Sequence, residues 1–290
     1  MSAAEREVDA VTGIETTGHE WDGVKELNKP LPKWWLFTFY ATVVWAVGYW
    51  VAYPAFPTLA GYTKGLLGYS QRQTVVDEVN AARAAQTAFH DRIAVASLQE
   101  IEQRADLLRF AMAAGAPAFQ SNCAPCHGRG AQGFIGYPNL NDDDWLWGGT
   151  LDDIFKTISG GVRSGSKAAR DSQMPRYGLD TLLDGQQIND AAEFVLSLTG
   201  RSSDAGAVAR GQTIFLEQCA ACHGTDGKGK QELGAPNLTD QIWLYGGSKS
   251  AVEESIRTGR GGVMPAWAGR LDEVTLKSLA IYVHSLGGGK

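Results

Sequence analysis

The stretch NCAPCHG at residues 122–128 recurs as QCAACHG at residues 218–224, and these two copies contain all four cysteines of the chain. In each copy two cysteines stand three positions apart, and a histidine follows the second one directly. On one helical turn this spacing brings both sulfurs within reach of the vinyl groups of one haem, while the imidazole meets its iron. The sequence therefore predicts two covalently bound haem c groups. Their expected thioether anchors are Cys123, Cys126, Cys219 and Cys222.

A disulfide, a zinc site and a thioredoxin-like redox pair are the alternatives to haem attachment. A zinc site would place its two cysteine pairs about fifteen to twenty residues apart, whereas Cys126 and Cys219 are far more widely separated. A redox pair gives no reason for His127 and His223 to follow each time. The doubled motif therefore favours haem.

The repetition extends beyond the cysteines, which indicates a duplicated domain of roughly 85 residues. Each copy closes with an apolar helical pattern that ends in glycine. A haem at the centre of each core would stabilise domains too small to bury much apolar surface alone. The matching features are Phe119 and Phe215, PNL at 138–140 and 236–238, DWLWGG at 144–149 and IWLYGG at 242–247, and Met-Pro at 174–175 and 264–265.

The repeat also selects the expected second axial ligand of each iron. Met174 and Met264 lie 47 and 41 residues after the motif histidines, His127 and His223, and each precedes a proline that stiffens its loop. Met112 lies before the first motif in an alanine-rich helical stretch, where core packing is expected. We expect each methionine to serve the haem of its own half, although the sequence leaves a crossing of ligands between the halves open.

A His/Met pair determines what such an iron does. Thioether sulfur raises the reduction potential, and a filled sixth position leaves no place for oxygen or peroxide. The sequence therefore predicts electron transfer and no catalytic residue. The carbonyls of Pro138 and Pro236 are candidate acceptors for the Nδ1 protons of His127 and His223, with simple turn prolines as the alternative.

Four further side chains recur, or nearly recur, between the halves. They are candidates for contact with haem propionates, with core packing of the tryptophans and solvation of the arginines as the alternative. These residues are Trp145, Trp243, Arg163 and Arg257.

Residues 34–53 form a run of twenty positions without a charge, the length a helix needs to cross a bilayer. Lys33 precedes the run, Pro54 follows it, and aromatic residues stand at both ends. A cleaved signal peptide fits poorly because the apolar run is too long and no small-residue cleavage site follows. A buried soluble helix would need a large surrounding core. We therefore predict a permanent membrane anchor.

The flanking charges predict the orientation of this anchor. Three lysines crowd its N-terminal side, whereas the other flank has only Lys64 and Arg72 farther off. The positive-inside tendency therefore places the N-terminal tail in the cytoplasm and everything after the anchor on the outer side. The three lysines are Lys25, Lys29 and Lys33.

Composition argues against a nucleic-acid role. The chain has 26 Lys and Arg against 32 Asp and Glu, a formal charge of −6, and no basic runs. The expected partners are a lipid bilayer and other proteins. Residues 115–200 are acidic, with ten carboxylates and six bases, and would attract a basic electron donor unless they form an ordinary solvated surface.

The order of these parts resembles the diheme subunit of cbb3-type cytochrome c oxidases, and the resemblance covers nearly the whole chain. Its most specific features are NKPLPKWW at residues 28–35 and YPAFP at residues 53–57, which bracket the membrane segment. Two CxxCH domains, each with a later Met-Pro, complete it. Two alternatives remain: a free-standing membrane-tethered diheme cytochrome, and a diheme peroxidase, which would need one open iron.

The resemblance implies an all-α fold with one transmembrane helix, a helical connector and two tandem class I cytochrome c domains. It implies a subunit that receives electrons from a cytochrome c or the bc1 complex and passes them towards a monohaem c-type subunit and an oxygen-reducing haem–copper subunit. The implied place is the bacterial inner membrane, crossed once, with both haem domains periplasmic. The expected parts are a cytoplasmic tail (1–33), anchor (34–56), connector (57–109), and haem domains (110–200 and 201–290).

Carried over residue by residue, the resemblance also implies the iron ligands. His127 pairs with Met174, and His223 pairs with Met264. The four cysteines of the repeated motif are the thioether anchors.

Overall fold

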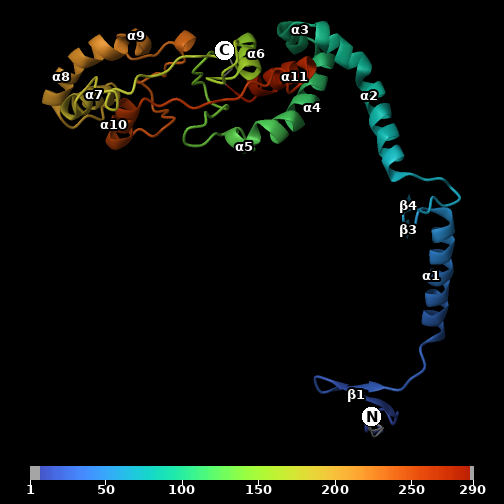
Figure 1. Ribbon diagram of the computed structural model, residues 1–290. Helices are drawn as coiled ribbons and strands as arrows, with labels where there is room; N and C mark the ends of the chain where they lie inside the picture. Colours follow the sequence, from blue (N-terminus) through green and yellow to red (C-terminus); the bar gives the residue numbers. More distant parts are fainter. Residues whose placement is uncertain (1–6, 288–290) are drawn as a thin grey trace. The chain divides into compact units, whose positions relative to one another are not determined.

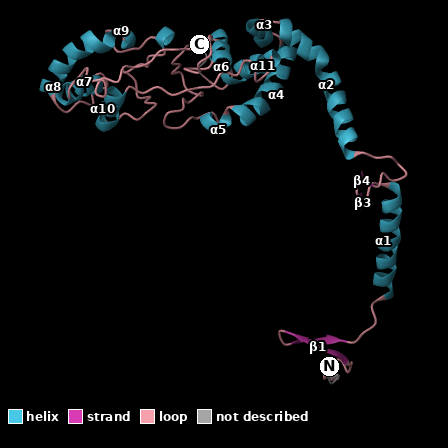
Figure 2. Ribbon diagram, in the orientation of Figure 1, coloured by secondary structure: helices cyan, strands magenta, loops and turns pink. Residues whose placement is uncertain are grey.

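The computed structural model describes residues 7–287 of the chain (Figure 1). The chain divides into two compact units, with the boundary after Ala84. Helices supply most of the regular structure in the described part, which confirms the expected all-α class (Figure 2). Strands occur there only in two small hairpins, both in the first unit.

The first unit contains these two antiparallel hairpins, one long helix and the beginning of a second helix. The second helix continues into the second unit. The elements are β1 (Thr16–Trp21), β2 (Val24–Leu27), α1 (Lys33–Ala52), β3 (Pro57–Thr58), β4 (Gly61–Tyr62) and α2 (Gln71–Val95).

Helix α1 coincides with the predicted anchor. It begins after Pro32 and ends at Tyr53, just before Pro54, whose ring has no N–H to continue the helical hydrogen bonds. Its twenty residues are long and apolar enough to cross a membrane, and none of them is buried within the protein. An apolar helix with no buried face requires an apolar solvent around it, as a bilayer provides.

The second unit contains the remaining helices and both cysteine motifs. The motifs end in the short helices α5 and α9. The elements are α3 (Leu98–Gln103), α4 (Ala105–Asn122), α5 (Ala124–His127), α6 (Leu151–Gly160), α7 (Gly185–Ser197), α8 (Ala205–Ile214), the π-helix η1 (Phe215–Cys219), α9 (Ala220–His223), the 3₁₀-helix η2 (Gln231–Leu233), α10 (Lys249–Thr258) and α11 (Glu273–His284).

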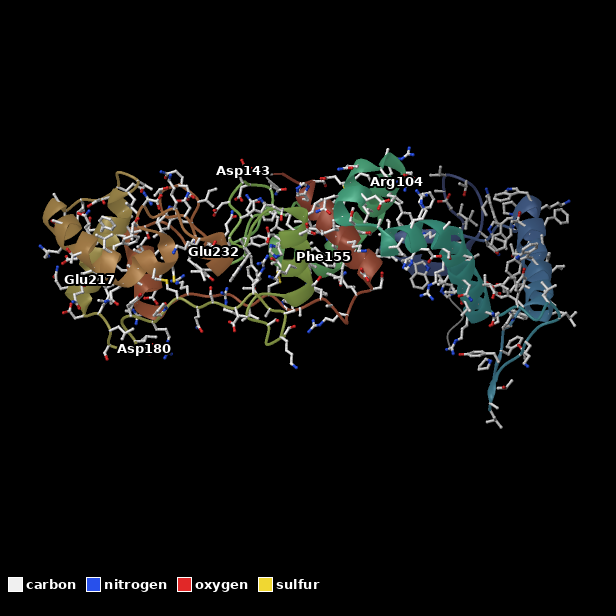
Figure 3. All side chains as sticks on the ribbon, turned by 90° about the horizontal axis from the view of Figure 1, so that it is seen from above. Arg104, Asp143, Phe155, Asp180, Glu217 and Glu232 are labelled. Atoms are coloured by element: carbon white, nitrogen blue, oxygen red, sulfur yellow. The ribbon has the colours of Figure 1, made fainter. Side chains whose placement is uncertain are left out.

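The second unit has two hydrophobic cores, and each defines a lobe. In the first lobe, α11 from the end of the chain packs against α4 and α6. In the second lobe, α7 packs against α8 and α10. Figure 3 shows Asp180, which precedes α7, at the same end of the unit as Glu217 of η1. Each lobe therefore draws helices from both halves of the duplicated sequence.

Two glycines allow α11 to approach α4 closely and α7 to approach α8 closely. A side chain on Gly115 of α4 would lie 2.4 Å from the carbonyl oxygen of Ser278 in α11. At the equivalent position of α8, a side chain on Gly211 would lie 1.9 Å from the carbonyl oxygen of Asp190 in α7. Only glycine permits such contact between helix backbones. Both copies of the repeat therefore have a glycine at this helix crossing.

The segment that follows α6 and the segment that carries Met264 pair in a short antiparallel β-bridge. The Val162 N–H donates to the Met264 carbonyl at 3.0 Å, and the Met264 N–H donates to the Val162 carbonyl at 2.9 Å. Since both halves carry the same kinds of helix, the closing helix of either half fits the opening helix of the other, as in domain swapping.

A buried carboxylate stabilises the second lobe. Glu193 of α7 is fully buried and accepts hydrogen bonds from Ser202 Oγ at 2.5 Å and the Ser203 N–H at 3.0 Å. Lys249 Nζ lies 2.7 Å from the same carboxylate. Hydrogen bonds from Lys249 and Ser202 lower the Glu193 pKa to about 2, despite the opposing effect of burial.

We expect Glu193→Gln to lower the free energy of unfolding by about 3 kcal/mol at pH 7, since one pKa unit corresponds to about 1.4 kcal/mol. Because the folded pKa is depressed, this contribution is complete above the unfolded pKa of about 4.3 and is lost as pH falls towards 2. Denaturant unfolding of both proteins at pH 7 and pH 3 measures it. A difference that stays constant between these pH values would contradict this role of the charge.

Candidate haem sites

Each motif histidine is held in one orientation by the predicted proline carbonyl. His127 Nδ1 lies 3.0 Å from the Pro138 oxygen, and His223 Nδ1 lies 3.1 Å from the Pro236 oxygen. Burial lowers the pKa of both histidines, so each ring is neutral at pH 7. A neutral imidazole that donates from Nδ1 leaves Nε2 with a free lone pair, as an iron ligand requires. The prediction for both prolines is confirmed.

The loop after each motif returns to the histidine in the same way. The Gly133 N–H donates to the His127 carbonyl at 2.8 Å, and the Gly229 N–H donates to the His223 carbonyl at 2.7 Å. A side chain on either glycine would lie within 2.4 Å of a carbonyl oxygen across the loop. These glycines bring each proline carbonyl back over its histidine.

The cysteines have the chemistry of attachment points. All four lie in the described part of the chain, and none forms a disulfide. Burial raises the pKa of Cys123 and of Cys219 to about 11, so both thiols are protonated at neutral pH. The partner cysteines, Cys126 and Cys222, are exposed.

The methionines do not stay with the motif of their own half. Met264 packs against the buried cluster of the first lobe, which contains Cys123 and Phe119. Met174 packs against the cluster of the second lobe, which contains Phe215. The expectation that each methionine serves the haem of its own half does not fit this packing. Its physical cause is the helix exchange, which carries each Met-Pro segment into the opposite lobe.

Tyr177, which was not among the predicted site residues, connects the Met174 segment to the second lobe. Tyr177, three residues after Met174, donates its hydroxyl proton to the Gln218 carbonyl at 2.5 Å, directly before the second motif. Burial is the main cause that raises its pKa to about 12. Trp267 stands at the equivalent position after Met264, and its backbone N–H donates to the Ile158 carbonyl of α6 at 3.2 Å. The aromatic residue three positions after each methionine was the sequence signal from which this contact could have been predicted.

Two glycines place the methionine backbones. Gly161 and Gly259 follow α6 and α10 with φ of +71° and +61°. A side chain on Gly161 would lie 2.4 Å from the Met264 carbonyl oxygen, and one on Gly259 would lie 2.5 Å from that of Met174. Both sites therefore use a left-handed glycine to seat the methionine of the other half.

We expect Gly161→Ala to lower the free energy of unfolding by about 2 kcal/mol or more, because it adds a clash with Met264 to the cost of positive φ. Gly165→Ala is the matched control: its φ is +77°, but nothing lies within 4 Å of the added carbon. It should cost only about 1 kcal/mol. Denaturant unfolding measures both. Equal losses would show that the contact with Met264 carries no cost.

The four residues predicted to contact haem propionates differ in their surroundings. Arg163 donates to the Gly262 and Ser172 carbonyls, each at 2.7 Å, and Arg257 forms an ion pair with Glu254 at 2.6 Å. Both guanidinium groups therefore have other partners. The buried Nε1 of Trp243 has no hydrogen-bond partner among the described residues, which suits a donor for a propionate. For Trp145 the contact stays a prediction.

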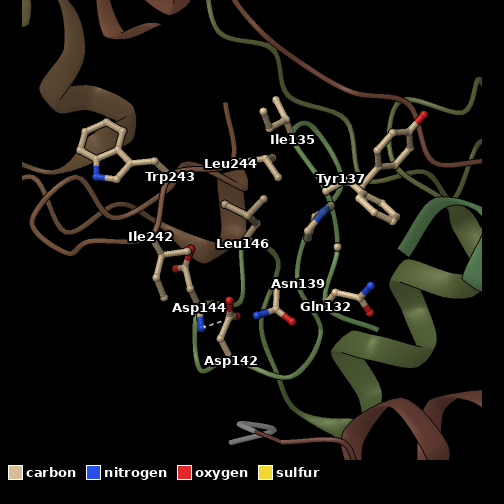
Figure 4. Close-up of a pocket in the computed structure, with 13 residues that line it drawn as sticks. Gln132, Ile135, Tyr137, Asn139, Asp142, Asp144, Leu146, Ile242, Trp243 and Leu244 are labelled. Atoms are coloured by element: carbon tan, nitrogen blue, oxygen red, sulfur yellow. Dashed lines mark hydrogen bonds between the residues drawn. The ribbon is translucent and has the colours of Figure 1, made fainter. Parts of the chain in front are cut away.

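A cavity of about 270 Å³ lies between the two lobes, beside the Pro138 loop (Figure 4). Asp142 and Asp144 lie close together in it, and the Asp144 N–H donates to the Asp142 carboxylate at 3.2 Å. Burial, together with the nearby charge of Asp240 from the second lobe, raises the Asp144 pKa to about 6. Acidic loops from both lobes therefore converge at the junction.

Three family models match the chain. Residues 13–60 match the N-terminal domain of cytochrome oxidase-cbb3, FixP, and residues 112–199 match cytochrome c. Residues 206–283 match cytochrome C oxidase, cbb3-type, subunit III. Together with the membrane helix and two CxxCH motifs, these matches define a membrane-anchored diheme c-type cytochrome.

Similarity to curated proteins extends over the full chain. The cbb3-type cytochrome c oxidase subunit FixP of Bradyrhizobium diazoefficiens is 53% identical over 98% of this chain and 98% of its own length. The subunit CcoP of Azospirillum brasilense is 51% identical over 99% of this chain and 100% of its own length. The chain belongs to the FixP/CcoP family of cbb3-type cytochrome c oxidase subunits. It accordingly carries two covalently bound haem c groups.

Proposed function

We propose that this chain is the membrane-anchored electron relay of a cbb3-type oxidase. It takes electrons from a donor cytochrome c or bc1 complex and passes them, through a monohaem c-type subunit, towards the haem–copper subunit that reduces oxygen. The observation that carries the proposal is that each lobe brings a neutral, oriented histidine and one thioether to the core beside a CxxCH motif.

The proposed iron ligands are crossed between the halves. His127 and Met264 hold the haem attached to Cys123 and Cys126, whereas His223 and Met174 hold the haem attached to Cys219 and Cys222. The support is the packing of each methionine in the opposite lobe, together with the bond between Tyr177 and Gln218.

These residues suit electron transfer better than bond chemistry. Bound haem c supplies a reversible one-electron centre. The histidines are fixed by their proline carbonyls, so the ligand set needs little rearrangement when the charge on the iron changes. The thioethers would ligate the two irons and would favour the reduced state. A diheme peroxidase needs one accessible iron, and the matching Met-Pro segments of both lobes weigh against it.

We propose that the N-terminal tail lies in the cytoplasm and both lobes in the periplasm. The support is the positive-inside tendency applied to Lys25, Lys29 and Lys33 at the N-terminal side of α1. A reporter active only after export, fused after Gly68, should be active. A cytoplasmic reporter at the same position should be silent. Activity of the cytoplasmic reporter alone would refute this topology.

Pyridine-haemochrome analysis of protein purified from native membranes in mild detergent tests membership of the complex. We expect haem b to co-purify with an excess of haem c. Two haems c per chain without haem b would instead support the free-standing tethered cytochrome.

A further inference from the structure

The hairpin of β1 and β2 in the N-terminal tail is an unusually small folded element. Two-stranded hairpins are marginally stable in water unless one face is covered. Among the described residues, the segment before β1 lies against its start: the Thr16 N–H donates to the Glu7 carbonyl at 2.7 Å, and the Asp9 N–H donates to the Ile14 carbonyl at 2.9 Å. This packing leaves Thr16 2% exposed.

The opposite face of the hairpin is open and carries apolar side chains. Trp21 and Val24 face each other across the strands, and each is 70% exposed. Glu26 lies two residues beyond Val24, hence on the same face, and accepts a hydrogen bond from Thr17 at 3.2 Å. Lys25 points to the covered face, where it pairs with Glu7. The open face therefore combines an apolar pair with a carboxylate.

The charge of this region decides between lipid and protein as the occupant of the open face. Residues 7–28 contain six acidic residues and one lysine, a formal charge of −5. The cytoplasmic leaflet is negatively charged and repels such a segment. Cytoplasmic loops of multi-span membrane proteins are rich in Lys and Arg and attract it. Only five residues separate β2 from α1, so the hairpin stays close to the membrane surface, where such loops emerge.

We propose that the hairpin Thr16–Leu27 is a docking element that binds the Lys/Arg-rich cytoplasmic loops of a multi-span subunit of the same complex. Trp21 and Val24 form the apolar centre of the contact, and the Glu26 carboxylate of the same face pairs with a basic side chain. This inference rests on the cytoplasmic placement of the tail and on the complex membership proposed above.

Photo-crosslinking in native membranes tests the identity of the occupant. Trp21 is replaced by p-benzoylphenylalanine in the full-length chain, and the adduct is identified by mass spectrometry. Val11, which is 93% exposed, carries the same photo-reactive residue in the control. We expect position 21 to form an adduct with a cytoplasmic loop of a multi-span subunit, at a yield at least about threefold above position 11. An adduct with lipid, or equal yields from both positions, would overturn the proposal.

A salt challenge of the purified complex tests the energetic role of the same face. Trp21→Ala/Glu26→Gln removes one apolar side chain and one carboxylate from the open face. Val11→Ala/Glu20→Gln removes the same kinds of group elsewhere and is the control. At raised ionic strength, we expect the first variant chain to dissociate from the haem b-containing part of the complex at least about threefold more than the wild-type chain does. The second variant should behave like the wild type.

The two proposals fail in different ways. If the wild-type chain itself retains no haem b, the proposed complex membership fails. If the wild type retains haem b and the Trp21/Glu26 variant behaves like the control, only the docking role of the hairpin fails. The ratio of haem c to chain should be the same in all three proteins, because the hairpin lies outside the lobes.

Discussion

A chain that ends at Gly200 should fail to form a stable first lobe, although it contains the complete first half of the duplication. It lacks Met264 and α11, which pack against α4 and α6 in the intact protein. Loss of α11 alone exposes a set of fully buried side chains, at about 1.5–3 kcal/mol each, which is comparable with the whole stability of a small domain. We therefore expect haem at Cys123 and Cys126, if attached, to lack methionine ligation and to sit in a chain without a cooperative unfolding transition.

Supplying the missing half in trans is the control for this truncation. Co-expression of residues 1–200 with an exported piece that contains residues 201–290 should restore both lobes, because all the crossing contacts are non-covalent. Visible absorption of the ferric haem reports methionine ligation, and denaturant unfolding reports cooperativity. A truncated chain that alone shows methionine-ligated haem and cooperative unfolding would refute the exchange of helices.

The second large effect should follow from exchanging a methionine ligand for histidine. Met264→His should lower the midpoint potential of the haem attached to Cys123 and Cys126, since bis-histidine ligation stabilises the ferric state. Axial ligands move haem potentials within a range of about 0.8 V, so we expect a drop on the order of 0.1–0.3 V. A drop of about 0.12 V already changes a one-electron equilibrium about a hundredfold. Electron flow through the relay should fall accordingly, while covalent attachment remains.

Redox titration followed by visible spectroscopy measures this change, and Met112→His is its matched control. Met112 packs against the core of the first lobe and has no proposed role as a ligand. Its substitution should cost stability but leave both midpoint potentials close to those of the wild type. If Met264→His also leaves both potentials unchanged, Met264 does not bind either iron.

The sequence predicted the parts of each haem site but could not predict how they combine. CxxCH and the proline after it are local patterns, and the structure places them as expected at His127 and Pro138. The pairing between halves is different, because a duplicated sequence offers equivalent helices to both partners. In the structure Gly115 of α4 packs against α11, the closing helix of the second half. Nothing in the residues around Gly115 indicates that α4 should pack against α11 rather than against α7, the closing helix of the first half.

The hairpin of the N-terminal tail was predictable in principle. Asp22 and Gly23 have φ of +50° and +84°, as a type I′ turn requires, and Asp-Gly between strand-like segments is a strong signal for it. Without that signal, residues 1–33 are interpreted only as a polar cytoplasmic tail. The connector was simpler: α2 and α3 follow directly from a segment rich in helix formers, and Ser70 Oγ accepts from the Gln73 N–H at its start.

The two lobes exchange their methionines, so that the proposed relay is one interlaced unit. Nuclear Overhauser contacts in the reduced full-length protein, between the ε-methyl group of each ¹³C-labelled methionine and the thioether protons of each haem, test it most directly. We expect contacts of Met264 with the haem of Cys123 and Cys126, and of Met174 with the haem of Cys219 and Cys222. Contacts of Met174 with the first haem and of Met264 with the second would contradict it.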